Sequence, residues 1–257
     1  MAIFDSHCHL YWDEDDIPVA TLLDAAQQVA VTKFMCVGTN AVTSARCLEI
    51  SEQFPQVIAS LGIHPNDVGE LDSLPSKLSE IRGMSADGRW HAIGETGLDF
   101  FHKRCDPAAQ KQSFLFHLDL AAELKLPTII HCRDAVKEMV EVLEERDQRV
   151  NGVMHCFSEG PEFVKRLLNL GLHFSFAGNL SYPNAQQIRD AACEIPLDRL
   201  LVETDAPFLA PQPKRGKKNQ SAYIVHTLEA LAKARSQSVD EIGKQIFANT
   251  ERLFGFK

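Results

Sequence analysis

The 257-residue sequence lacks the signals that mark export, membrane insertion and disulfide cross-linking. Its N-terminus has neither a basic start nor an apolar stretch of signal-peptide length. No window of the sequence reaches the roughly 18 apolar residues that a bilayer-spanning helix needs. The 7 cysteines are odd in number and spread from Cys8 to Cys193 without a C-x-x-C pair, which excludes a small disulfide-stapled scaffold and favours a reducing compartment. We therefore expect a cytoplasmic protein.

Positive charge is also scarce, because 26 lysines and arginines face 35 aspartates and glutamates, for a formal net charge of −9. Such a balance argues against a protein that coats nucleic acid or anionic membrane by bulk charge. A nuclease remains compatible with it, since an active site needs only local positive potential. With 45% hydrophobic and 24% charged residues and no biased tract, the chain is typical of a globular protein with a sizeable core. We expect no membrane contact, no protein partner and a monomer.

Strand-like and helix-like segments alternate along the chain, without a linker or a shift in composition. Eight short apolar runs predict strands over residues 3–7, 33–38, 57–63, 91–96, 128–132, 152–156, 173–178 and 200–204. The spacing between them predicts helices over residues 19–31, 43–53, 74–84, 108–124, 135–146, 161–170, 184–193 and 221–234, and one further helix over 239–254.

Eight strand–helix units are the number that closes a barrel, and about 250 residues is the usual length of this fold. We predict an α/β protein, a single (β/α)₈ TIM-barrel domain over residues 1–257 with an additional C-terminal helix. The alternative is an open doubly wound sheet, but no G-x-G-x-x-G follows the first strand to favour it.

Polar residues that can bind metal stand at the carboxyl ends of most of these predicted strands. They are His7 and His9 on the first, His64 on the third, Glu95 on the fourth, His131 on the fifth, His155 on the sixth and Asp205 on the eighth. In a barrel these ends meet at one face, where the active sites of the fold lie. We therefore predict one convergent cluster, with His7, His9, Glu95, His131, His155 and Asp205 as metal ligands.

Local geometry suggests a separate role for several of these residues. Residues two apart in a strand face the same side, so His7 and His9 can both point into the barrel while Cys8 points outward. A carboxylate has two oxygens, so Glu95 can bridge two cations, and the glycines beside it leave room for a ligand to approach. Asp205 is expected to bind metal and accept a proton from water, with Glu203 as a supporting interior group. Asp205 and Glu95 are thus the predicted catalytic residues.

Mixed nitrogen and oxygen donors suit Zn²⁺ or Mn²⁺ better than an all-oxygen cage for Mg²⁺ or Ca²⁺. We predict two divalent metal ions, Zn²⁺, Mn²⁺ or Mg²⁺, which together activate water for hydrolysis. The cysteines that follow His131 and His155 are turned away from them, so Cys132 and Cys156 are not expected to act as nucleophiles.

Substrate contacts are predicted from positive charge near the same strand ends. A loop after the eighth strand, residues 214–218, holds four cations in five positions, and Arg215 and Lys217 are the candidates there. Loops after the last two strands are frequent phosphate sites in barrels. Arg133 and the pair Lys103-Arg104 add charge to this rim, and His64 is expected to hold a phosphate or orient water. The remaining histidines are expected to be structural: His91, His102, His117, His173 and His226.

Seven segments together resemble the TatD family of metal-dependent deoxyribonucleases, within the metallo-dependent hydrolase superfamily. They are residues 5–10, 62–65, 94–99, 126–135, 155–158, 203–211 and 215–219, and residues 249–254 are similar to the family's closing helix. The sequence departs from the family in having Gln220 and Ser221 after the basic loop, in place of Glu and Pro, and Glu159 in place of Gly.

The resemblance implies a (β/α)₈ barrel with a centre for two metals. One metal would lie among His7, His9, Glu95 and Asp205, and the other among Glu95, His131 and His155. It also implies hydrolysis of phosphodiester bonds in DNA, often from an end. DNA ends or single strands are thus the expected substrate.

Two other classes of function remain open. A metallo-amidohydrolase or phosphoesterase acting on a small metabolite would use the same barrel site. The basic loop favours DNA over this alternative, and Glu95 stands where the commonest amidohydrolases have a lysine. A non-catalytic metal-binding protein is disfavoured by the full set of six ligands, because an inert scaffold has no need of open coordination positions.

Overall fold

Eight parallel strands form the centre of the molecule in a computed structural model that describes residues 1–12, 17–146 and 148–256. Each strand pairs with the next one in the chain, in the order β1 to β8. The strands are β1 Ile3–Cys8, β2 Val31–Cys36, β3 Val57–Leu61, β4 Ala92–Asp99, β5 Thr128–Arg133, β6 Gly152–Met154, β7 His173–Phe176 and β8 Leu200–Val202.

The sheet closes where the end of β1 meets the segment after β8. Cys8 and Ala206 form a parallel bridge, and the His9 amide donates to the Ala206 carbonyl at 2.9 Å. Deeper in the wall, the buried carboxylate of Asp5 accepts hydrogen bonds from the Thr204 amide at 2.9 Å and the Thr204 hydroxyl at 2.6 Å. The predicted TIM barrel is therefore confirmed.

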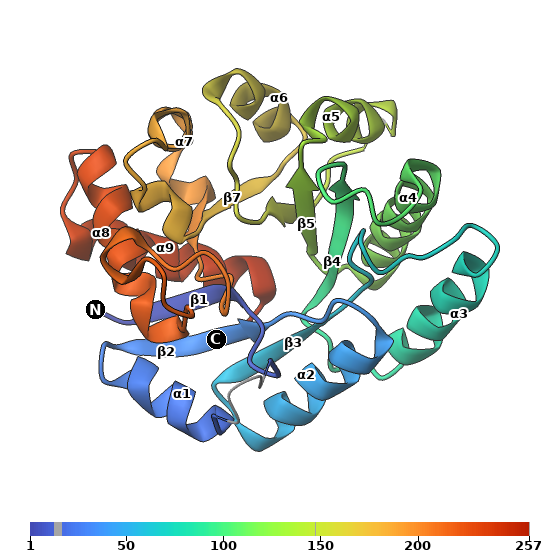
Figure 1. The fold of residues 1–257 in the computed structure, drawn as a ribbon, viewed down its shortest axis with the longest axis horizontal. Coiled ribbons are helices and arrows are strands. Elements are labelled where there is room, and N and C mark those ends of the chain that lie inside the picture. The colour runs from blue at the N-terminus through green and yellow to red at the C-terminus, as the bar shows by residue number, and fades with distance from the viewer. Residues whose placement is uncertain (13–16, 147, 257) are drawn as a thin grey trace.

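Helices surround the ring of strands on its outside (Figure 1). They are α1 Val19–Gln27, α2 Ala41–Gln53, α3 Leu74–Ser85, α4 Pro107–Leu124, α5 Val136–Glu145, α6 Val164–Asn169, α7 Gln186–Glu194 and α8 Ile224–Ala234, and the additional helix α9 Val239–Phe254 follows α8. The helix predicted over residues 19–31 ends earlier, because the buried Val31 begins β2 and pairs with Ile3. The predicted starts at Pro161 and Ser221 are short 3₁₀ turns that precede α6 and α8.

Apolar residues fill the barrel at the ends where the strands begin. Phe4, Met35, Ile58, Ala92, Ile129, Val153 and Leu201 form one buried cluster with Leu253 and Phe254 of α9. The Phe4 ring lies 6.1 to 6.3 Å from the rings of Phe247, Phe254 and Phe256. The additional helix α9 thus closes the amino-terminal end of the barrel, and the carboxyl ends of the strands are left for the polar cluster. Among the helices that the structure describes, none is long and apolar enough to cross a bilayer.

Candidate metal centre

The six predicted metal ligands come together at the carboxyl ends of the strands. His7 lies in β1 and His9 directly after it, Glu95 in β4, His131 in β5, His155 after β6 and Asp205 after β8. His7, His9, Glu95 and His155 are buried, and the side chains of His131 and Asp205 are 15% and 14% exposed. The cluster is therefore mostly shielded from solvent but opens on one side.

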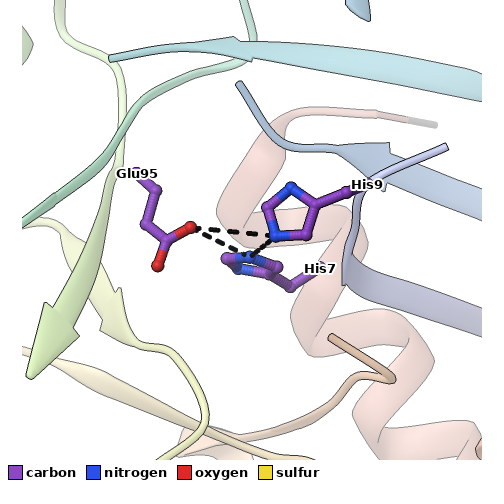
Figure 2. Close-up of side chains that lie close together, drawn as sticks. All are labelled: His7, His9 and Glu95. Atoms are coloured by element: carbon purple, nitrogen blue, oxygen red, sulfur yellow. Dashed lines mark hydrogen bonds and ion pairs between the residues drawn. The ribbon is translucent and has the colours of Figure 1, made fainter. Parts of the chain in front are cut away.

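The first donor group consists of His7, His9, Glu95 and Asp205. His7 Nε2 lies 3.3 Å from His9 Nε2, 3.4 Å from Glu95 Oε2 and 3.6 Å from Asp205 Oδ1. His9 Nε2 lies 3.5 Å from Asp205 Oδ1 and 3.9 Å from Glu95 Oε2. Figure 2 shows the two imidazoles and the carboxylate of Glu95 pointing toward one another. Each of the two imidazoles thus lies within 3.9 Å of both carboxylates.

The second donor group uses the other oxygen of Glu95. Glu95 Oε1 lies 2.8 Å from His155 Nε2 and 2.9 Å from His131 Nδ1, and these two nitrogens are 3.2 Å apart. His64 Nε2 approaches the same oxygen at 3.5 Å. Glu95 therefore lies between the two groups, with one oxygen toward each.

Several of these histidines have a partner for the ring nitrogen that faces away from the cluster. His155 Nδ1 lies 3.2 Å from Glu203 Oε1, His131 Nε2 lies 3.2 Å from Asp99 Oδ2, and His9 Nδ1 lies 2.8 Å from the carbonyl oxygen of Val37. An acceptor there fixes the proton on the outer nitrogen and leaves the inner lone pair for a cation, as in protein metal sites generally. His7 Nδ1 is buried and has no partner among the described residues.

The electrostatics of the cluster keep its carboxylates ionised. Burial would raise the pKa of Glu95, but His155, His64 and His7 around it hold that pKa well below its ordinary value. The pKa of Asp205 is likewise lowered, because the hydrogen bond with His9 and the nearby His7 outweigh its burial. Burial opposes charge on His155, yet Glu95 and Glu203 raise its pKa well above the ordinary value. These donor atoms lie too close together to face one another without a proton or cation between them, so the set fits divalent metals.

The glycines beside Glu95 have a different role from the one that the sequence indicates. Gly94 and Gly97 have φ angles of 134° and 145°, in the region that favours glycine. A Cβ atom at Gly94 would collide with the carbonyl of Ile129, and one at Gly97 with the carbonyl of His131. The expectation that these glycines leave room for a ligand is wrong. They allow β4 to approach β5 closely, which brings Glu95 and His131 together.

A cavity of about 650 Å³ opens over the cluster and identifies the side chains that a substrate can reach. Of the predicted substrate residues, His64 and Arg133 line it. Burial and the nearby His131 lower the pKa of His64 to about 3, so its imidazole is neutral at physiological pH. Arg215 and Lys217 do not line this cavity: Arg215 stacks on Tyr182 at 4.0 Å from the ring centre, and Lys217 is exposed. Their part in substrate binding stays a prediction.

One histidine that we expect to be structural belongs to this cavity. His102 lines it, and His102 Nδ1 lies 2.7 Å from Asp99 Oδ2, which also accepts a hydrogen bond from Asn66 Nδ2 at 2.9 Å. Burial would raise the pKa of Asp99, but His131 and His102 keep it well below the ordinary value. The sequence could have predicted Asp99, because residues four apart in a strand face the same side and Asp99 follows Glu95 by four. His102 follows in a loop, where no such period applies.

The two cysteines beside the cluster are poor nucleophiles. Burial raises the pKa of both Cys132 and Cys156 well above the usual range, so neither thiol ionises near neutral pH. The prediction that they take no catalytic part agrees with this environment.

Comparison with known proteins decides the family. The profile of the family described as TatD related DNase matches residues 4–255. The chain belongs to the TatD family of metal-dependent hydrolases. Among its TatD relatives, the uncharacterized metal-dependent hydrolase YcfH of Escherichia coli K12 is 37% identical over 99% of this chain and 96% of its own. The uncharacterized metal-dependent hydrolase YabD of Bacillus subtilis is 35% identical over 98% of each chain.

A solved structure extends the comparison to three dimensions. The TatD homologue YjjV of Escherichia coli superposes with a TM-score of 0.90 at 28% identity, over 99% of this chain and 98% of that chain. The family and the barrel that the sequence motifs imply are therefore both confirmed.

Proposed function

We propose that this TatD protein hydrolyses phosphodiester bonds at the ends or single-stranded parts of DNA, with two divalent cations at its centre. The observation that carries the proposal is the position of Glu95, which presents one carboxylate oxygen to each of two donor groups. A carboxylate between two such groups is typical of two-metal phosphodiesterases and nucleases.

The residues that would hold the cations are those of the two donor groups. His7, His9, Glu95 and Asp205 would hold one cation, and Glu95, His131 and His155 the other. Their mixed nitrogen and oxygen character favours Zn²⁺ or Mn²⁺ over Mg²⁺. When bound, the pair would lower the pKa of an attacking water and stabilise the charge on the phosphoryl oxygens.

The protein's own side chains bind the phosphate and move the proton. Attack of water forms one P–O bond and breaks the ester P–O bond, and Asp205 accepts the proton that the water loses. The leaving oxygen takes a proton from solvent in the cavity. Arg133 lines the same cavity and offsets the negative charge of the substrate backbone, and the neutral His64 can hydrogen-bond an oxygen of the phosphate that is hydrolysed.

A second candidate is a phosphoesterase that acts on a small metabolite. It is favoured by one observation, since Arg215 and Lys217 do not line the cavity that His64 and Arg133 line. A small phosphoester would need only His64 and Arg133 inside the cavity, whereas a DNA strand would extend beyond the cavity.

The test begins by stripping the protein of metal and restoring Zn²⁺, Mn²⁺ or Mg²⁺ singly. Single-stranded DNA labelled at the 3′ or 5′ end is then followed beside small phosphoesters and a panel of amides. We expect metal-restored activity on DNA, two bound metals per chain, and loss of about 10³-fold in Asp205→Asn, because several kcal/mol of transition-state stabilisation would be removed. Asp240→Asn is the control, an exposed aspartate in α9 at the other end of the barrel. DNA hydrolysis that persists in chelator or in Asp205→Asn contradicts the proposal, and activity on small phosphoesters alone establishes the second candidate.

A further inference from the structure

Two apolar rings are left exposed at the mouth of the metal cavity. Trp12 is 37% exposed and Phe208 is 44% exposed, and both line the cavity. Their ring centres are 5.2 Å apart and their planes meet at 77°, so the edge of one ring contacts the face of the other. Exposed large apolar side chains that lie together at one cavity are typical of a ligand-binding surface. We refer to Trp12 and Phe208 as the aromatic pair.

The aromatic pair is tied to the turns that carry two of the metal ligands. The Trp12 amide donates to the carbonyl of His9 at 3.0 Å, and the Phe208 amide donates to the carbonyl of Asp205 at 2.8 Å. Asn219 Nδ2 holds the carbonyl of Phe208 at 2.7 Å. The Phe208 ring also lies 6.1 Å from the His9 ring. The pair is therefore held at a fixed place beside the first donor group.

The opposite wall of the cavity carries two arginines, beside the paired carboxylate of Asp99. Arg104 and Arg133 line it there, on the side of β4 and β5. The Arg133 guanidinium is stacked on the Phe101 ring, 4.1 Å from its centre, which holds the charged group in place. The cavity thus has an aromatic wall, a wall with two arginines, and the two donor groups between them.

We propose that the aromatic pair stacks the nucleobase on one side of the scissile phosphate, and that the next backbone phosphate on the other side faces Arg133 and Arg104. The inference rests on the proposed function and adds the place and direction of the bound strand. A planar ring next to an anion is the repeating chemistry of a single nucleic-acid strand. Stacking on aromatic side chains accepts any base, because every base has a π-face.

The first experiment measures kcat/KM on a single-stranded oligonucleotide and on the same strand with abasic residues flanking the cleaved bond. We expect the wild type to lose about 10-fold on the abasic strand, the size typical of one stacked base. On the normal strand, kcat/KM of the double variant Trp12→Ala, Phe208→Ala should be about 10-fold lower than that of the wild type. On the abasic strand, the double variant and the wild type should have nearly the same kcat/KM. Trp12→Phe retains a ring and should keep most of the discrimination. A double variant that still prefers the base-bearing strand as strongly as the wild type overturns the inference.

The second experiment reads binding without turnover. The chain has 2 tryptophans, and Trp90 is buried, so Trp90→Phe leaves Trp12 as the only indole. A phosphorothioate strand that resists hydrolysis is added to the Zn²⁺-loaded protein. We expect quenching of Trp12 fluorescence by the base-bearing strand and none by its abasic counterpart. Equal quenching by both strands, or by neither, overturns the inference.

The two experiments separate failure of the inference from failure of the proposed function. If the wild type hydrolyses DNA and the aromatic variants prefer the base-bearing strand over the abasic strand as strongly as the wild type does, only the inference fails. If the wild type hydrolyses no DNA, the proposed function fails, and the fluorescence experiment still decides whether the aromatic pair binds bases.

Discussion

The two ends of the barrel are built from the same eight strands but from opposite chemistry. At the amino-terminal end the strands contribute apolar side chains such as Phe4 and Ile129, which pack against α9. At the carboxyl end they contribute imidazoles and carboxylates, with donor atoms 2.8 to 3.9 Å apart. Packing apolar groups together stabilises the fold, whereas crowding polar donors opposes it unless cations lie between them. The barrel therefore separates stability from chemistry along its own axis.

The largest expected effect tests the apolar end. Phe4 is 1% exposed among three other aromatic rings, so Phe4→Ala should lower the free energy of unfolding by about 3–5 kcal/mol. The kcat of the protein that remains folded should be unchanged, because Phe4 packs in the apolar cluster against α9 and not among the donor groups. Urea denaturation and metal-restored activity measure the two quantities.

A phenylalanine at the other end provides the control for this prediction. Phe101 is 52% exposed, and Phe101→Ala should change the free energy of unfolding by no more than about 0.5 kcal/mol. The comparison between the two ends breaks down if Phe101→Ala destabilises as strongly as Phe4→Ala, or if Phe4→Ala lowers kcat.

An intermediate effect tests the contact between a buried carboxylate and one of the histidines of the metal centre. Glu203 is fully buried and contacts His155 Nδ1 at 3.2 Å, so Glu203→Gln should reduce metal affinity about 10- to 100-fold. Competition with a metal chelator of known affinity measures the change. Glu229→Gln is the matched control, because Glu229 contacts His226 Nδ1 at 3.3 Å on the surface. Equal metal affinity in Glu203→Gln and the wild type would show that this carboxylate does not support the centre.

The smallest effect concerns His117, a buried histidine in helix α4 on the outside of the ring of strands. His117 in α4 accepts a hydrogen bond from the Ile63 amide at 3.2 Å and donates to the Ser113 carbonyl at 2.7 Å. Burial lowers its pKa from 6.5 to about 4, so the unfolded chain binds a proton at pH 5 to 6 that the folded chain does not. Stability should therefore fall as the pH drops from above 6.5 toward 4.

At pH 6 this loss should be about 1 kcal/mol relative to pH 8. Urea denaturation of the metal-loaded protein at the two pH values measures it, and His117→Gln should remove that part of the pH dependence. His226→Gln, at a histidine on the surface, is the control. An unchanged pH dependence in His117→Gln would contradict this account.

Most of the fold was accessible to sequence reasoning because strand and helix periods are local. The helix predicted over residues 239–254 is the observed α9, and the eight predicted strands all form. The ligands were accessible for the same reason, since polar residues such as Glu95 and Asp205 end apolar strands. The loop residues around these ligands were harder to predict. His102 and Asn66 reach Asp99 from loops, and loop paths follow from contacts between residues far apart in the chain.

The sequence by itself determined the eight strand–helix units, the family, and which residues stand at the strand ends, because each depends on spacing along the chain. Only the tertiary structure decided what surrounds those residues. It placed one oxygen of Glu95 toward each donor group, brought Trp12 beside Phe208, and turned Arg215 onto Tyr182 instead of into the cavity. These outcomes depend on the closure of the barrel and on loops that meet across it, and neither has a local period that a sequence could reveal.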